Sequence, residues 1–206
     1  MGEVVEEMLA NVPATVFQGD LDKMTEIRDK DEQVDALYGA INSYLTKVSR
    51  RDLMESTANE AMMLTTTTTE IENIGDIIEI HMSHLATMCS VNHIAFSEED
   101  LNSLNLFHGR VKKAFGSAMV AIEHDRRAAA QMVLDMEQEI IGDMEELVTK
   151  RQRAFLQEDH TSQEMAAFTL QTDIMENLKR IYEHTKRISK LVLRQEGGTA
   201  LATIHS

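Results

Sequence analysis

The chain has 206 residues and carries 35 acidic against 20 basic side chains, a formal net charge of −15. A nucleic-acid binder needs a clustered basic face to meet the phosphate backbone, so this balance argues against DNA or RNA as a partner. Aromatic residues make up 4%, Trp is absent and Pro occurs once, which favours long helices with an aliphatic core. The lone Cys89 leaves no intramolecular disulfide and fits a reducing cytosol.

Membrane and export signals are also missing from the pattern. No apolar run approaches the roughly 20 residues that a membrane-spanning helix needs. The opening Met1-Gly2-Glu3 has no basic stretch of the kind that starts a signal peptide. We therefore expect this chain itself to contain no membrane span.

Apolar residues at helical spacing predict three helices in the first half, over about 3–17, 21–49 and 52–88. Pro13 lies inside the first and should kink it or end it early. The second and third each carry an apolar seam with alternating gaps of three and four residues, as in a heptad pattern. Thr65–Thr69 has the propensity of a strand, but the third seam passes through it unbroken and predicts helix.

The second half predicts three more helices, over about 98–123, 126–156 and 161–194, after a loop at 89–97. Ser97 with Asp100 resembles a helix N-cap, and Thr161 with Glu164 a capping box. Gly197-Gly198 is a typical helix stop, and we predict that residues 196–206 form a flexible tail.

The order of one short and two long helices occurs twice, and several landmarks recur at nearly one offset. Gly19-Asp20 corresponds to His124-Asp125 at an offset of about 105, and Asp76 to Glu183 at an offset of 107. These matches predict an all-α fold of two tandem three-helix bundles, with repeat 1 at 1–90 and repeat 2 at 98–195.

Three pairs of acidic residues stand four positions apart near the predicted seams: Asp31/Asp35, Glu72/Asp76 and Asp135/Glu139. Residues at this spacing lie on one helix face, where like charges repel. They persist together if they are solvated, paired with a base such as Lys30 or Arg28, or bound to a cation. Antiparallel packing of the second and third helices would assemble four carboxylates, which hard or borderline metals accept as ligands. The residues alone leave the solvated face and the metal site both open.

An enzyme is the weakest alternative. A carboxylate-bridged di-iron bundle needs Glu-x-x-His on each of two helices, and none of the eight His has Glu three positions before it. A Gly-rich phosphate loop, a Cys cluster and a nucleophile elbow are also missing from the sequence. His81 and His84 are more simply interpreted as a seam and a surface histidine. We predict no catalytic residue and no enzymatic activity.

The third predicted helix contains the run Thr69–Glu79, whose Ile-Glu-Asn-Ile-Gly-Asp core resembles the signature of the PhoU family. Asp35–Ile41 is similar to the second-helix motif of that family. Leu178–Ile188 resembles a degraded second copy of the signature, with Lys179 at an acidic position and Glu183 in place of Asp. Three stretches are closer to the PhoU-like tails of sodium/phosphate cotransporters than to stand-alone PhoU: Ile74–Glu79, Phe96–Glu99 and Leu178–Ile181.

The resemblance covers about residues 3–194. It implies two three-helix bundles and, in some members, multinuclear iron or zinc clusters held by acidic motifs. Carried over residue by residue, the first metal site would comprise Asp31, Asp35, Glu72 and Asp76. The weaker second site would comprise Asp135, Glu139 and Glu183, with the Lys179 ammonium competing against a metal.

The same resemblance implies a cytoplasmic PhoU-like regulatory domain of a sodium/phosphate cotransporter, at the inner face of the membrane as part of a membrane protein. Its partners would be the membrane portion of the transporter or phosphate-signalling proteins. A homodimer is also compatible with the resemblance. The alternative is a stand-alone PhoU-type adaptor that represses phosphate-starvation signalling. A purely structural bundle that dimerises a transporter is a further alternative.

Overall fold

The computed structural model describes residues 1–49, 55–156 and 161–194, and these ranges are helical apart from short turns and loops, with no strand. The elements in chain order are α1 Gly2–Val12, η1 Pro13–Phe17, α2 Leu21–Ser49, α3 Glu55–Asp76, η2 Ile77–Met82, α4 Ser83–Val91, α5 Glu98–His124, α6 Arg127–Asp135, α7 Glu137–Phe155 and α8 Ser162–Arg194. They form six rods over the described ranges, which confirms the predicted all-α class.

Three of the rods are interrupted. Pro13 ends α1 and opens the π-helical turn η1, as expected of a residue that cannot donate its backbone hydrogen bond. A second π-helical turn, η2, joins α3 to α4, so the third rod is helical from Glu55 to Val91 and outlasts its predicted end. The predicted fifth helix is divided at Met136, where ψ is −9°. No Pro or Gly stands beside Met136 to signal this break.

The turns that end the first rod of each half share one device. Gly19 has φ of +74° and Asp125 has φ of +49°, both in the left-handed region. Directly after Gly19, the Asp20 Oδ1 accepts hydrogen bonds from the N–H groups of Asp22 and Lys23 at 3.0 and 3.1 Å, which caps α2. The matched turns support the repeat that the spacing predicts.

Both helix starts predicted in the second half are confirmed. The Ser97 Oγ accepts the Asp100 N–H at 3.2 Å while the Asp100 carboxylate accepts the Ser97 N–H at 3.3 Å. The Thr161 N–H donates to Glu164 at 2.8 Å, and the Glu164 N–H donates back to Thr161 at 3.3 Å. These reciprocal bonds satisfy N–H groups that have no partner inside the helix.

The threonine run is helical, as the seam predicts. Each of four hydroxyls donates to the carbonyl four residues earlier: Thr65, Thr66, Thr68 and Thr69. At Thr68, which is buried, this bond satisfies the hydroxyl within the helix. The hydroxyl of Thr67, which is also buried, has no hydrogen-bond partner among the described residues. Over the ranges that the structure describes, no helix combines the length and the apolar character that crossing a lipid bilayer demands.

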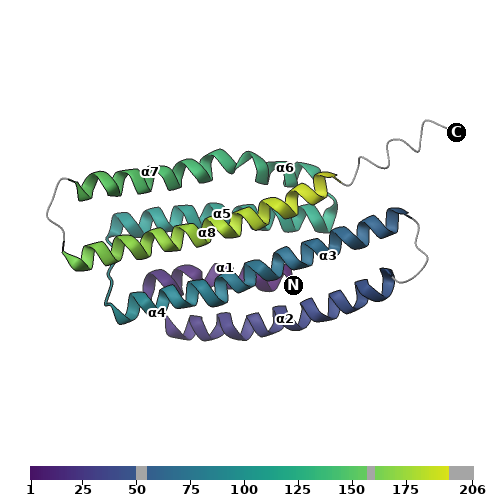
Figure 1. Ribbon diagram of the computed structural model, residues 1–206, viewed down its shortest axis with the longest axis horizontal. Helices are drawn as coiled ribbons and strands as arrows, with labels where there is room; N and C mark the ends of the chain where they lie inside the picture. Colours follow the sequence, from purple (N-terminus) through teal and green to yellow (C-terminus); the bar gives the residue numbers. More distant parts are fainter. Residues whose placement is uncertain (50–54, 157–160, 195–206) are drawn as a thin grey trace.

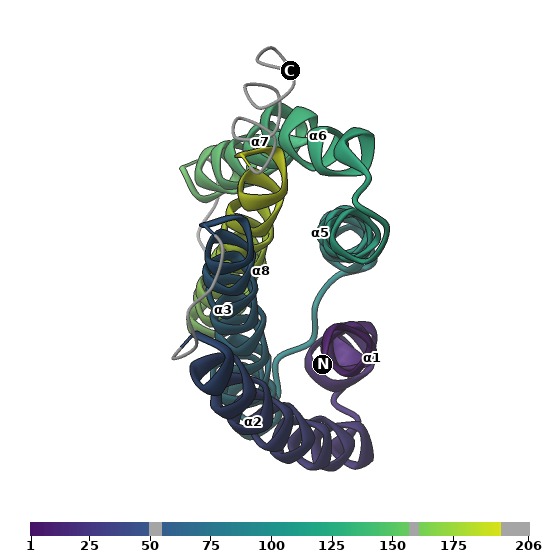
Figure 2. The ribbon, with the colours of Figure 1, turned by 90° about the vertical axis from the view of Figure 1, so that its right-hand side faces the viewer.

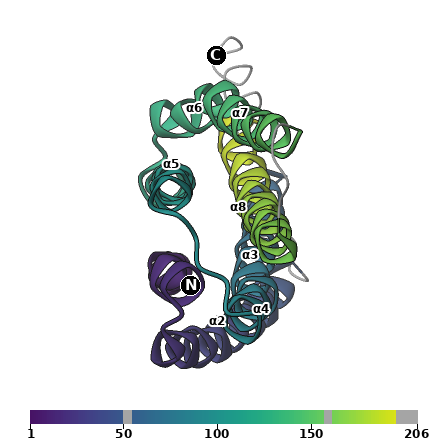
Figure 3. The ribbon, with the colours of Figure 1, turned by 90° about the vertical axis from the view of Figure 1, so that its left-hand side faces the viewer.

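In Figure 2, which looks along the longest axis of the molecule, the rods form two groups of three stacked one above the other. α1 and α5 lie side by side on one side, and α3 and α8 pack against each other on the other side. α2 closes the molecule at one end and α6 and α7 close it at the other, and the opposite view in Figure 3 shows the same arc. Figure 1 shows that α2, α3 and α8 run roughly lengthwise, which places their seams alongside one another.

One continuous apolar core crosses from the first group into the second. It includes Met8 and Leu9 of α1, Phe107 and Phe115 of α5 and Tyr182 of α8, all with 0% exposure. A buried polar bond adds to this junction, since the His108 Nε2 donates to the Leu9 carbonyl at 2.8 Å. Burial lowers the pKa of His108, which keeps the ring neutral.

The boundaries 1–90 and 98–195 stay a prediction, and the predicted tail at 196–206 lies outside the described residues. Cys89 is buried beside the core, and burial raises the pKa of its thiol to about 11. It therefore behaves as the small apolar residue that its isolation in the sequence suggests.

Candidate functional site

The seam between α2 and α3 carries four of the predicted site residues. Asp31 and Asp35 come from α2, and Glu72 and Asp76 come from α3. Gly75 makes the approach of the two helices close, because a Cβ at this position would lie 3.3 Å from the Asp31 Oδ1. The helical spacing of four residues thus places two carboxylates on each of two facing helices, as the sequence predicts.

The carboxylates of this seam raise one another's pKa values by electrostatic repulsion. Burial raises the pKa of Asp31 to about 6, with further increases from Asp35, Glu79, Asp76 and Glu72. Burial, Asp76 and Asp35 raise the pKa of Glu72. Burial and Asp35 raise the pKa of Asp76, whereas His81 acts in the opposite direction. The structure therefore adds a fifth carboxylate, Glu79, to the four that were predicted. We call these five residues the acidic seam.

No Lys or Arg in the described ranges forms an ion pair with the acidic seam. Lys30, one of the two bases named as partners from the sequence, reaches Glu7 on α1 instead. Arg28, the other, is exposed. Of the three ways to keep like charges together, pairing with a base is not used here, which leaves solvation or a bound cation.

The oxygen chemistry of the acidic seam suits a hard or borderline cation. A cation would supply the positive charge that offsets the repulsion among these carboxylates. The side-chain positions do not form a finished site, however, because across the described residues no three His, Cys, Asp or Glu side chains gather closely enough to share one metal ion. A metal would therefore require the seam carboxylates to change rotamer and converge.

In the second half, the predicted residues are dispersed. Asp135 is exposed and accepts a hydrogen bond from the Gln131 Nε2 at 2.8 Å. Glu139 is also exposed. Glu183 binds the Lys186 ammonium at 2.8 Å, so its carboxylate already has a cation partner.

Lys186 is the residue that the sequence reasoning missed. It is 7% exposed, and its Nζ lies 2.7 Å from Glu137 and 5.7 Å from the centre of the Tyr182 ring. Burial alone would lower the pKa of Lys186, but hydrogen bonds to Glu137 and Glu183 outweigh it and the net shift is upward. The Tyr182 hydroxyl donates to the Val133 carbonyl at 2.9 Å, which fixes the ring below the ammonium. Lys186, Glu137 and Glu183 form what we call the lysine seam.

Lys179, the base that we expected to compete with a metal, is half-buried and forms no ion pair within the described ranges. The signal that could have identified Lys186 was its position. It follows Glu183 by three residues, just as Glu79 follows Asp76, and both pairs of equivalents differ by 107 in number. Residues three apart on a helix are neighbours, so Lys186 was within reach of Glu183 from spacing alone.

A polar bridge joins the two seams' third helices. The Glu70 Oε2 on α3 lies 2.6 Å from the His184 Nδ1 and 3.5 Å from the Arg187 Nη1, both on α8. The side chains of Glu70 and His184 are 14% and 15% exposed. His81 and His84 are exposed and take no part in this bridge. The bridge aligns α3 with α8 at the boundary between the halves.

These features define a class: an all-α protein built from two three-helix units, with a charged seam between the second and third rods of each. Residues 1–80 match the family model of the PhoU domain, which confirms the predicted resemblance for the first half. No curated protein sequence matches the chain.

The crystal structure of PhoU from Pseudomonas aeruginosa is similar over nearly the whole chain. Its TM-score is 0.84 at 16% sequence identity, and the match covers 96% of this chain and 92% of that chain. At this identity the likeness shows the fold, so the chain has the fold of PhoU across both halves. Neither of these two matches concerns a sodium/phosphate cotransporter.

Proposed function

We propose that this chain is a non-enzymatic regulator of phosphate uptake that acts through contacts of its helical surfaces with other proteins. The observation that carries the proposal is the PhoU-domain match over residues 1–80, the stretch that holds the acidic seam. The correspondence with 92% of the PhoU chain from Pseudomonas aeruginosa extends it to the second half. Phosphate-transport or phosphate-signalling proteins on the cytoplasmic side of a membrane are the proposed partners.

The stand-alone adaptor is the form that we put first, because the chain corresponds to a PhoU protein over nearly its full length. The regulatory domain of a sodium/phosphate cotransporter is the second form. Its support is the likeness of Ile74–Glu79, Phe96–Glu99 and Leu178–Ile181 to such domains. The reading frame upstream of Met1 separates the two, since transmembrane helices encoded there support the cotransporter form.

A complementation experiment tests the regulatory role. The chain is expressed in a Pseudomonas aeruginosa strain that lacks its own PhoU, and a phosphate-starvation reporter is followed in phosphate-rich medium. We expect the chain to restore repression of the reporter, whereas the empty vector does not. A reporter that stays active while the soluble chain accumulates to the level of native PhoU would contradict the proposal.

The non-enzymatic part has a separate test. The support for this part is that the sequence has no Gly-rich phosphate loop, Cys cluster or nucleophile elbow. We expect the purified chain to release no phosphate from a general phosphatase substrate. Phosphatase activity that follows the protein peak through two chromatographic steps would overturn this part.

A further inference from the structure

An open groove of 480 Å³ lies between α5 and α6. Its floor includes the small residues Gly116 and Ala129, and its apolar rim is made by Val120 and Met132, which are 37% and 46% exposed. The groove also contains Lys113 on α5 and Arg126 in the turn before α6. Small residues beneath exposed apolar ones leave room for an inserted apolar side chain, which is the usual floor of a helix-binding groove.

The two cations of the groove have no ion-pair partner in the ranges that the structure describes. No acidic residue lines the groove. Lys113 lies about three helical turns before the end of α5, roughly 16 Å along the helix at 1.5 Å per residue. Arg126 follows directly after that end. The groove is therefore a local basic and apolar surface on an acidic protein.

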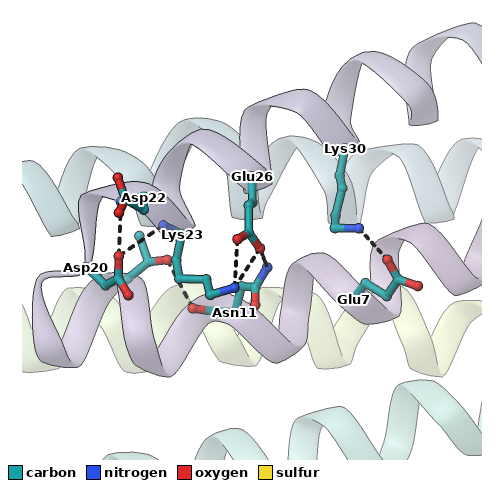
Figure 4. Close-up of polar contacts among 8 residues, drawn as sticks. Glu7, Asn11, Asp20, Asp22, Lys23, Glu26 and Lys30 are labelled. Carbon is teal, nitrogen blue, oxygen red and sulfur yellow. Dashed lines mark hydrogen bonds and ion pairs between the residues drawn. The ribbon is translucent and has the colours of Figure 1, made fainter.

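The α1–α2 seam, the equivalent position in the first half, is bridged by polar contacts. There the α1–α2 seam is bridged by a bond from the Asn11 Nδ2 to Glu26 at 3.3 Å and by the ion pair between Lys30 and Glu7 (Figure 4). Lys23 binds the same Glu26 at 2.7 Å. These contacts pair Lys23 and Lys30 of the α1–α2 seam with acids of the same chain.

The α5–α6 seam has no such closure. No ion pair crosses it among the described residues, and the Ser117 Oγ reaches only the Met132 sulfur, at 3.8 Å. Sulfur is a weak acceptor, so this contact holds the two helices together much less than the bonds of the α1–α2 seam. Lys113 and Arg126 thus have no ion pair where Lys23 and Lys30 of the α1–α2 seam have one, although one turn before Lys113 the Arg110 guanidinium pairs with Asp143 on α7.

We propose that the α5–α6 groove binds an acidic amphipathic helix of a partner protein. An apolar side chain of this helix would lie between Val120 and Met132, and acidic residues three turns apart would reach Lys113 and Arg126. In the groove an acidic ligand meets two cations and no acidic lining residue, so it is repelled less there than over a surface of the chain's average charge. A second copy of the chain or an anionic membrane would instead meet the net charge of −15 over a broad area. The proposal deepens the regulatory role and depends on it for the class of partner.

The test uses the full chain and two fluorescein-labelled synthetic helical peptides of about 16 residues. Both carry a Leu stripe at helical spacing. One places Glu pairs about three turns apart beside the stripe, and the other replaces each Glu by Lys. We expect the Glu peptide to bind by fluorescence anisotropy at low salt and the Lys peptide to bind at least about tenfold more weakly.

Two variants locate the binding surface. Lys113→Glu combined with Arg126→Glu should weaken binding of the Glu peptide by about tenfold or more, and Met132→Ala by about threefold. Lys112→Glu is the matched control: it is the neighbouring residue but lines a different surface, beside Glu3, Glu6 and Glu7. The substituted groove cations take part in no ion pair among the described residues, and circular dichroism melting checks that each variant folds.

Three results would overturn the groove proposal. They are no binding of the Glu peptide below about 1 mM, equal loss of binding in the Lys112→Glu control, and sedimentation showing a dimer that the double variant breaks. The complementation assay separates this from the proposed function. Repression that fails while the peptide still binds contradicts the regulatory role alone, whereas repression restored without peptide binding contradicts the groove alone.

Discussion

The acidic seam of the first half and the lysine seam of the second solve one electrostatic problem in different ways. Both place carboxylates between a second and a third rod. In the second half, Lys186 stands between Glu137 and Glu183 at hydrogen-bond distance. In the first half, the equivalent position is Glu79, which adds to the negative charge around Asp31. In the second half, the positive charge beside the carboxylates comes from Lys186. In the first half, no basic side chain of the described residues occupies the equivalent position, so solvent or a bound cation must offset the repulsion.

The difference extends to neighbouring positions on the third rods. At the offset of 107, Glu72 is replaced by Lys179 and Gly75 by the buried Tyr182. Gly75 allows α3 to come close to Asp31, whereas Tyr182 supports the Lys186 ammonium from below. The two seams therefore differ in packing as well as in charge. The lysine seam is a different arrangement of side chains, and not the acidic seam with some of its residues lost.

The largest effect should come from removing the internal cation. Lys186→Met leaves Glu137 and Glu183 without their partner, and breaking such a pair costs several kcal/mol when it is fully buried. Because these carboxylates are partly exposed, we expect a loss of about 2 to 3 kcal/mol, seen as a fall of several degrees in Tm. Lys179→Met is the control and should change Tm little. Equal losses in the two variants would show that Lys186 contributes no specific pairing.

Adding metal should raise the Tm through the acidic seam and not through the lysine seam. We propose that zinc or iron stabilises the chain through Asp31, Asp35, Glu72 and Asp76. Linkage gives about 1.4 kcal/mol at a tenfold excess over Kd. Asp76→Asn should abolish the rise in Tm, while Glu183→Gln should leave it nearly unchanged. If elemental analysis finds no iron, zinc or calcium, and none of them raises Tm, the acidic seam is simply solvated.

A smaller effect concerns the pH dependence of the acidic seam. The pKa of Asp31 rises from 3.8 to about 6 on folding, so the folded state holds a proton that the unfolded state has lost between these pH values. Stability therefore falls as pH rises through this window. Asp31→Asn should remove that fall and stabilise the chain by about 1 kcal/mol at pH 7, after allowance for partial exposure.

Urea denaturation at pH 4 and pH 7 measures this effect, and the gain should vanish at the lower pH. Asp29→Asn, on an exposed position of the same helix, is the matched control. A gain of similar size at both pH values would mean that the substitution acts through packing or helix propensity and not through the charge of Asp31.

The smallest expected effect comes from copying one seam into the other. Glu79→Lys places an ammonium beside Asp31 and Asp76, and we expect a gain of about 0.5 kcal/mol at pH 7. It should also lower the pKa of Asp31, which a carbon-detected NMR titration of the carboxyl group follows. Glu32→Lys changes the net charge equally from an exposed site of α2 and should move this pKa less. Equal shifts of the Asp31 pKa in the two variants would mean that net charge, and not the position of Lys, accounts for the difference between the seams.

Much of the fold follows from periodicity because helix packing repeats along a rod. The heptad spacing predicted an apolar seam along α2, and three of the residues at this spacing, Ile27, Val34 and Leu45, are buried. The two capping boxes followed from residue types three apart. The break at Met136 could not be predicted in this way, because no Pro or Gly beside it marks it in the sequence.

The acidic seam was predicted in part because carboxylates four apart must share a face. Glu79 was missed because its influence on Asp31 acts across two helices and shows no local pattern. Lys186 was missed for a different reason. A long flexible side chain can turn to several neighbours, so its spacing from Glu183 does not by itself reveal burial against Tyr182.

The continuity of the apolar core has a thermodynamic consequence for both seams. Because Leu9 of α1 and Tyr182 of α8 belong to one buried cluster, neither half can unfold without exposing the core surface of the other. We therefore expect the chain to unfold as one cooperative unit, so that stabilisation at either seam raises the free energy of unfolding of the whole chain. An ion that binds between α2 and α3 would accordingly make the global opening that exposes α8 rarer, across a boundary that the ion never touches.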